Sequence, residues 1–85
     1  MQVACIGDDN MKLSEEIKRT RQKALLSQND FAEALSLSPS TIARWETARV
    51  RPTITAMKRI KSFCEANQLP FNDIENAWLN EENTI

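Results

Sequence analysis

Three scarcities limit what this 85-residue chain can be: it has no histidine, one glycine and two cysteines. Without histidine, neither a Cys/His zinc site nor a Ser-His or Cys-His catalytic pair can form. No glycine-rich loop is present to hold a phosphate group. We therefore expect no metal, no cofactor, no evident small-molecule ligand and no enzymatic activity.

Cysteines and long apolar runs are scarce as well. A disulfide between Cys5 and Cys64 is possible in principle, but two distant cysteines make no disulfide framework, so reduced thiols are expected. No apolar run approaches the about 20 residues that cross a bilayer. The first residues also lack the basic region and the long apolar region of a signal peptide. The expected location is the cytoplasm, with no membrane contact.

The composition that remains favours a small helical domain. The chain is 41% hydrophobic and has three prolines, which suits compact helices better than a turn-rich β-sandwich. Residues 18–51 carry seven basic and three acidic side chains, whereas residues 1–17 and 52–85 are net acidic. A basic middle region is typical of a surface that binds an anionic polymer, although a mixed solvated surface shows the same totals.

Signals for the start of a helix recur along the chain at short intervals. The predicted starts are Ser14, Ser27, Ser38, Thr53 and Asn72. Apolar residues recur behind each start at spacings of three and four, as in Ile54, Met57, Ile60 and Cys64. We predict an all-α fold of five helices over residues 13–80, with a flexible arm at 1–12 and a frayed tail at 81–85.

The connection between the second and third predicted helices is very short. Leu35 ends one helix and Ser38 caps the next, which makes the two helices cross steeply, as in a helix-turn-helix. Ile42 and Trp45 form the inward side of the third helix. The residues left facing outward are Ser40, Thr41 and Arg44. Small polar residues there can approach a groove floor, and an arginine one turn later can reach a guanine edge or a phosphate.

From Ile17 to Leu69 the chain resembles the lambda-repressor-like family of phage repressors, Cro proteins and XRE-type bacterial regulators. The stretches that carry the resemblance are Ser27-Gln28, Phe31-Ala32, Ser38 to Ile42, Arg44 to Glu46 and Arg49 to Pro52. The resemblance implies a sequence-specific regulator of transcription, acting as a repressor. It also implies a homodimer that binds a palindromic double-stranded DNA operator and lacks catalysis.

The same resemblance implies roles for particular residues. The base-reading positions match Ser40, Thr41 and Arg44. The phosphate-binding positions match Gln28, Thr47, Arg49 and Arg51. Arg21 and Glu46 match an ion pair that ties the first helix to the end of the third.

Three positions depart from the family pattern. Ser36 and Ala48 stand where glycine is usual, in the turn before the third helix and in the loop after it. A residue other than glycine is strained by about 1 kcal/mol in the left-handed conformation expected there. Pro39 replaces a base-reading glutamine of many relatives and cannot read a base by hydrogen bond.

Several assignments stay open on the residues alone. Trp78 is either a lid on the core or a dimer contact, and the dimer contact would consist of Ile74, Trp78 and Leu79 on the last helix. Lys58, Arg59 and Lys61 are expected to form a solvated helix face. The same fold also fits an antitoxin-like autoregulator, or a protein-interaction adaptor that does not bind DNA. The acidic ends of the chain keep the adaptor open.

Overall fold

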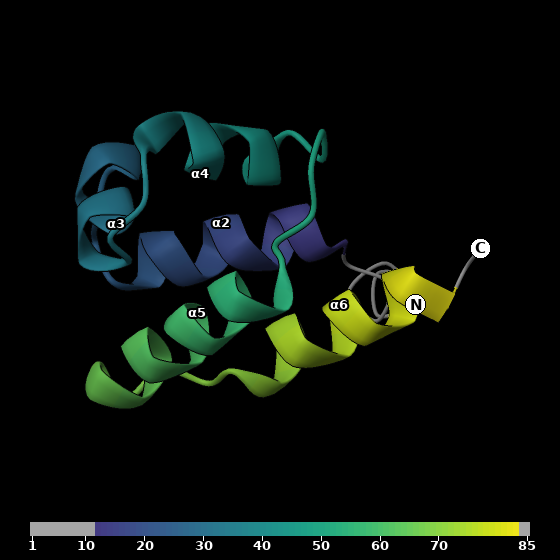
Figure 1. Cartoon of the computed structure of the whole chain (residues 1–85). Helices are drawn as coiled ribbons and strands as arrows, with labels where there is room; N and C mark the ends of the chain where they lie inside the picture. Colours follow the sequence, from purple (N-terminus) through teal and green to yellow (C-terminus); the bar gives the residue numbers. More distant parts are fainter. Residues whose placement is uncertain (1–11, 84–85) are drawn as a thin grey trace, which may run out of the picture.

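The computed structural model describes residues 12–83, and within them the chain forms five helices and no strand (Figure 1). The helices are α2 (Leu13–Lys23), α3 (Gln28–Ala34), α4 (Pro39–Glu46), α5 (Ile54–Ala66) and α6 (Asn72–Asn83). The predicted all-α fold is confirmed. The predicted arm at residues 1–12 lies outside the described residues, apart from Lys12. Within the described range, none of the helices combines the length and apolar character of a membrane span.

Three of the predicted helix starts are confirmed by hydrogen bonds at the caps. The hydroxyl groups of Ser27, Ser38 and Thr53 each accept a hydrogen bond from the backbone N–H three residues later, at 3.1, 3.3 and 3.2 Å. Each bond satisfies one of the amide groups that a helix start leaves without a partner. Pro39 follows its cap at the first helical position, where the missing N–H costs nothing.

One predicted helix start is wrong, and the last helix runs past the predicted domain end. Helix α2 begins at Leu13 with Lys12 at the cap, so Ser14 is not the cap but a buried residue of the first turn. The backbone N–H of Lys12 donates to Oε1 of Glu15 at 3.1 Å, which secures the start without a serine. Helix α6 runs to Asn83, so residues 81–83 continue the helix beyond the predicted domain end at residue 80.

The helices form two pairs on either side of α2. Helices α3 and α4 cross on one side of α2, and α5 and α6 lie on the other side (Figure 1). The loop after α4 runs past the start of α2 to the start of α5, beside α6 (Figure 1). Helix α4 therefore lies at the outside of the bundle, with one side against the core and the other toward solvent.

The core is formed where these pairs meet on α2. Its fully buried side chains include Ile17, Phe31, Ile42 and Ile60. Phe31 of α3 packs edge-on against Phe63 of α5, with ring centroids 5.2 Å apart. Aromatic pairs prefer this edge-to-face geometry. The contact joins the two helix pairs directly.

The apolar side of α5 differs from the predicted one. Ile54 is 63% exposed although it was expected to face inward, and the buried Phe63 was not among the predicted residues. Ile54 lies six residues before Ile60, which places it about 120° away around a helix with 100° per residue. A spacing of three from Met57 was therefore not enough to bring Ile54 into the core.

The four turns that follow α2, α3, α4 and α5 share one backbone design. Leu25, Ser36, Ala48 and Gln68 have φ angles of 60°, 60°, 63° and 58°, which is the left-handed region. In each turn the next residue donates its N–H to a carbonyl five residues back, as from Leu37 to Ala32 at 2.8 Å and from Arg49 to Arg44 at 2.9 Å. This is the Schellman ending, which usually has glycine at the left-handed position. Ser36 and Ala48 thus adopt the strained conformation expected from the sequence.

Candidate nucleic-acid interface

Helix α4 separates its residues as an amphipathic helix should. Ile42 and Trp45 are buried against the core, while Ser40 and Arg44 are exposed on the opposite side. Thr41 is half-buried at the edge between the two sides. The structure therefore brings the three predicted base-reading residues onto the first two turns of one outward surface.

The hydroxyl of Thr41 has a structural partner. It lies 3.0 Å from Oγ of Ser38, the residue that caps the helix. A hydroxyl can donate one hydrogen bond and accept two, so this contact leaves capacity for a second polar partner. Thr41 can thus contribute to the cap and to a ligand at the same time.

The loop after α4 carries a second exposed arginine. Arg49 is exposed, and its backbone N–H is held by the carbonyl of Arg44 at 2.9 Å. Thr47 is also exposed, and its hydroxyl donates to the carbonyl of Ala43 at 2.9 Å. Within the described residues, neither Arg44 nor Arg49 has an ion pair or a side-chain hydrogen bond. Two arginine side chains that contact no acidic group in the described residues therefore lie in the last turn of α4 and in the loop after it.

Arg21 and Glu46 form the predicted ion pair between α2 and α4. Nε of Arg21 donates to Oε2 of Glu46 at 2.7 Å and Nη2 donates to Oε1 at 3.1 Å, which is a two-pronged contact. The side chains are only 13% and 4% exposed. Nη1 of Arg21 donates to the carbonyl of Leu26 at 2.9 Å. The hydrogen bond to Glu46 raises the pKa of Arg21, so this guanidinium keeps its positive charge.

Gln28 belongs to the same cluster. Its amide Nε2 donates to Oε1 of Glu46 at 3.0 Å, and its side chain is half-buried. Glu46 therefore accepts hydrogen bonds from α2 and from the first residue of α3, and it joins both to the last turn of α4. This hydrogen bond holds the last turn of α4 against the start of α3, and it does so independently of any contact between Gln28 and a phosphate.

Arg51 differs from Arg49, the other arginine among the predicted phosphate ligands. Its side chain is half-buried and contacts Trp78 of α6, with Nη2 donating to the carbonyl of Trp78 at 2.6 Å. The guanidinium carbon lies 4.6 Å from the centroid of the Trp78 ring. Arg49 and Arg51 are two residues apart in the loop, but only Arg49 faces solvent freely.

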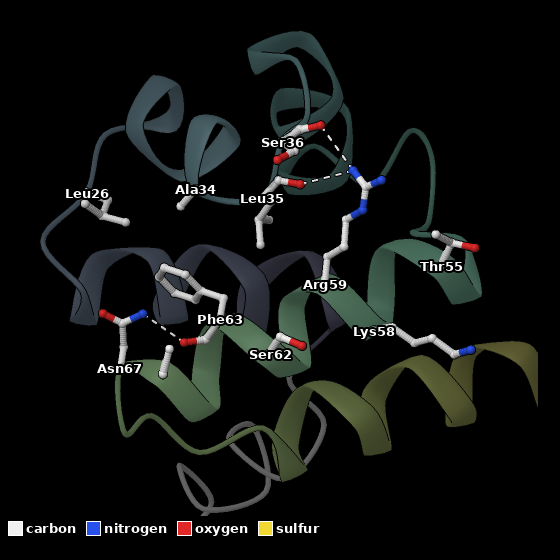
Figure 2. A pocket seen from close by; sticks show the side chains of 11 residues that line it. Leu26, Ala34, Leu35, Ser36, Thr55, Lys58, Arg59, Ser62, Phe63 and Asn67 are labelled. Atoms are coloured by element: carbon white, nitrogen blue, oxygen red, sulfur yellow. Dashed lines mark hydrogen bonds between the residues drawn. The ribbon is translucent and has the colours of Figure 1, made fainter.

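Arg59 of α5 stabilises the turn between α3 and α4 by hydrogen bonds to its backbone. Its Nη1 donates to the carbonyls of Leu35 at 3.2 Å and Ser36 at 3.1 Å, as Figure 2 shows. A positive charge at the C-terminal end of α3 also matches the helix dipole. Arg59 is exposed, as expected for a solvated helix face, but it also makes these two hydrogen bonds, which were not predicted. The partners lie 24 and 23 residues away in sequence, and no local pattern marks them.

An open groove of about 870 Å³ lies beside this arginine, between α3 and α5 (Figure 2). Leu26, Leu35 and Phe63 line it, together with the polar side chains of Lys58, Ser62 and Asn67.

Helix α6 packs one side against the core and leaves another side exposed. Ile74 is 1% exposed, so it has no surface to offer a second copy and does not belong to the predicted dimer contact. Trp78 is half-buried, and Leu79 is 43% exposed. A shallow groove of about 200 Å³ between α5 and α6 is lined by Ile54, Phe71, Trp78 and Leu79, among others. The open apolar surface thus spans both helices.

Nothing within residues 12–83 groups three or more His, Cys, Asp or Glu side chains into a metal-binding cluster. Cys64 is a free and buried thiol of α5. Burial raises the pKa of this thiol to about 11, so it is protonated at neutral pH. A protonated and buried thiol is a poor nucleophile, and Cys64 acts as a small apolar residue.

The steep α3–α4 crossing, the amphipathic α4 and the arginines at its outer end define a helix-turn-helix DNA-binding domain. Comparison with known proteins agrees: the helix-turn-helix family matches residues 17–65, and the chain belongs to this family, in its XRE and lambda-repressor-like form. The chain is also 33% identical over 64 residues to the Type II methyltransferase M.SsoII of Shigella sonnei. That alignment covers 72% of this chain and 17% of the methyltransferase. No solved structure matches the chain.

Proposed function

We propose that this protein is a sequence-specific regulator of transcription that binds double-stranded DNA and acts as a repressor. The observation that carries the proposal is the division of α4: Ile42 and Trp45 are buried, while Ser40 and Arg44 face outward beside the exposed Arg49. A helix of this kind fits the major groove, which is wide enough to admit it. The family match supports the DNA-binding part of the proposal.

Base reading is assigned to the first two turns of α4. Ser40 and Thr41 are small enough to let the helix start approach the base edges closely. Arg44 has a planar guanidinium that pairs with the two acceptors of guanine, a contact that discriminates against the wrong base by about 1–3 kcal/mol. Pro39, at the first helical position, has no hydrogen-bond donor with which to contact a base. We therefore assign the largest share of sequence discrimination to Arg44.

Phosphate binding is assigned to the residues around the end of α4. Arg49 supplies a full positive charge from an exposed loop, and Thr47 supplies a hydroxyl next to it. Gln28 can reach a phosphate from the start of α3 with the part of its amide that Glu46 does not use. Such contacts set the position of the protein on the duplex and leave the choice of sequence to the base contacts.

We also propose a homodimer on a palindromic operator, formed through the α5–α6 surface. Ile54 and Leu79 are exposed at 63% and 43%, and they border one groove with Trp78. Lys61 and Glu75 border the same groove. Since both signs of charge are present, two copies related by a two-fold axis can pair Lys61 of one with the acid of the other. Two recognition helices must then lie about 34 Å apart to enter successive major grooves.

The central experiment is selection of a bound sequence from a random duplex pool, followed by titration of the selected and a scrambled duplex across a salt series. A DNA-reading domain should bind the selected duplex more tightly and lose affinity steeply with salt. Arg44→Ala should weaken specific binding by about 1–3 kcal/mol and relax the preference at one or two base pairs. Arg44→Lys is the matched control, because it keeps the charge but loses the two-pronged contact.

Three outcomes would reject parts of this assignment. Equal losses on both duplexes for Arg44→Ala would move Arg44 to the phosphate contacts. A wild-type protein without salt-dependent affinity for any duplex would favour the adaptor function instead. For the repressor assignment, a reporter promoter that overlaps the selected site should lose transcription when the protein is supplied, and increased transcription would reverse this assignment.

The dimer is tested by sedimentation across a concentration series, with and without the selected duplex. Leu79→Ser and Ile54→Ser should weaken association, because both remove exposed apolar surface from the proposed contact. Leu25→Ser is the matched control, since Leu25 is 90% exposed but lies in the turn after α2. A monomeric wild type on DNA, or an equal effect of all three variants, would reject this contact.

A further inference from the structure

Arg51 was predicted to bind phosphate, but its contacts are directed to α6. Nη2 donates to the carbonyl of Trp78 at 2.6 Å, and the guanidinium carbon lies 4.6 Å from the centroid of the Trp78 ring. Its Nε is buried and has no hydrogen-bond partner within the described residues. A guanidinium that lies near an aromatic ring and donates to a carbonyl is stabilised where it is.

Trp78 returns a contact to the same loop. Its indole Nε1 donates to the carbonyl of Pro52 at 2.8 Å. Two adjacent loop residues, Arg51 and Pro52, are thus bound to one residue of α6 by two hydrogen bonds and a cation–π contact. We refer to these three residues as the Arg51–Trp78 tie.

The other end of the loop is bound to α4. The backbone N–H of Ala48 donates to the carbonyl of Trp45 at 3.2 Å, and that of Arg49 donates to Arg44 at 2.9 Å. The segment that carries Arg49 is therefore held by α4 on one side and, two residues later, by α6 on the other. A segment held at both ends loses less conformational freedom when it binds a ligand, which favours affinity.

We propose that Arg51 is a positioning residue rather than a phosphate ligand: through Trp78 it holds the loop that carries Arg49 at a fixed place relative to α6. The inference rests on the proposed DNA-binding function. A direct phosphate contact would have to draw the guanidinium away from a carbonyl and a ring that it already engages. Leu79, part of the proposed dimer surface, follows Trp78 on α6, so the tie also connects the DNA-facing loop with that surface.

The first arm of the test measures DNA binding of Arg51→Gln and Arg51→Lys across a salt series, with Arg49→Gln and Arg49→Lys as the matched pair. Arg49→Gln should reduce the slope of log affinity against log salt by about one, as expected for one lost phosphate contact. Arg51→Gln should leave that slope unchanged and weaken affinity about five- to tenfold. Arg51→Lys should weaken affinity as well. The lysine ammonium keeps the charge but lacks the planar guanidinium, which donates to the Trp78 carbonyl and lies near the Trp78 ring.

The second arm uses the free protein. Hydrogen exchange of the Arg49 amide, which is bonded to Arg44, should quicken about tenfold in Arg51→Gln, because one end of its loop is released. The amide of Leu37 is the internal control, since it makes the same type of bond in the turn after α3, far from Trp78. Circular dichroism at the assay temperature confirms that each variant is folded.

Three results would overturn the proposal. In the first, Arg51→Gln lowers the salt slope by about one while Arg51→Lys binds like wild type, and this pattern identifies a phosphate contact. In the second, both Arg51 variants bind DNA as tightly as the wild type, which means that Arg51 contributes only to the stability of the fold. Unchanged exchange at Arg49 shows that the tie does not hold the loop. If the wild type shows no DNA affinity, the proposed function fails, while the exchange measurement still decides whether the tie holds the loop.

Discussion

The ion pair between Arg21 and Glu46 offers the sharpest stability test, because its burial decides its energy. The side chains are 13% and 4% exposed, and Glu46 accepts three hydrogen bonds, two from Arg21 and one from Gln28. Removing one partner of a buried pair leaves the other poorly compensated and costs about 3–5 kcal/mol. An exposed pair would cost about 0–1 kcal/mol.

The consequence for the whole domain is large. At roughly 0.05–0.15 kcal/mol per residue, an ordered region of this size is stabilised by on the order of 4–10 kcal/mol. Arg21→Ala or Glu46→Ala should therefore remove a large part of the free energy of unfolding. The measurement is urea denaturation followed by circular dichroism, with Glu33→Ala as an exposed control that should change stability by less than about 0.5 kcal/mol.

The double variant separates pairing from independent effects. If the two side chains stabilise the fold by contacting each other, Arg21→Ala/Glu46→Ala should be no less stable than the worse single variant. Costs that simply add, or single-variant costs below about 1 kcal/mol, would refute the reasoning, because either result means that the pair is solvated in solution.

Three further predictions concern the helix ends and one buried acid. Ala48→Gly should raise the free energy of unfolding by up to about 1 kcal/mol in urea melts, because Ala48 has φ 63°, while Ala43→Gly inside α4 should lower it by a similar amount. Ser38→Ala should cost about 1 kcal/mol through the lost cap, and an unchanged melt would reject that role. Burial, and then the Asp73 charge, raise the pKa of Glu16 above 4.5, so the folded state binds this proton more tightly than the unfolded state. Since that contribution to stability is lost as pH rises through the raised pKa, Glu16→Gln should be more stable than wild type at pH 7, and the difference should shrink toward pH 4.5.

Local sequence determined where most helices begin and which side of α4 is buried. Three helix starts are capped by the hydroxyl groups of Ser27, Ser38 and Thr53. Each hydroxyl bonds an amide three residues later, so the cap depends only on residues within one helical turn. The outward position of Ser40 and Arg44 follows from helical periodicity once Ile42 and Trp45 are buried. The left-handed turns at Ser36 and Ala48 were expected from the family resemblance, and the structure has them.

Tertiary structure decided the features that depend on how distant helices cross. Arg51 meets Trp78 across 27 residues, and Arg59 meets Ser36 across 23, and neither distance is encoded by a helical period. Ile74 and Leu79 lie on the same short helix, but only the packing of α6 on α2 determines that one is buried and the other exposed. Periodicity tells which residues share a side of a helix, whereas the direction of that side depends on every other helix in the bundle. The sequence alone therefore predicted which side of α4 faces outward, and only the assembled bundle separated the arginine that faces solvent from the arginine that contacts α6.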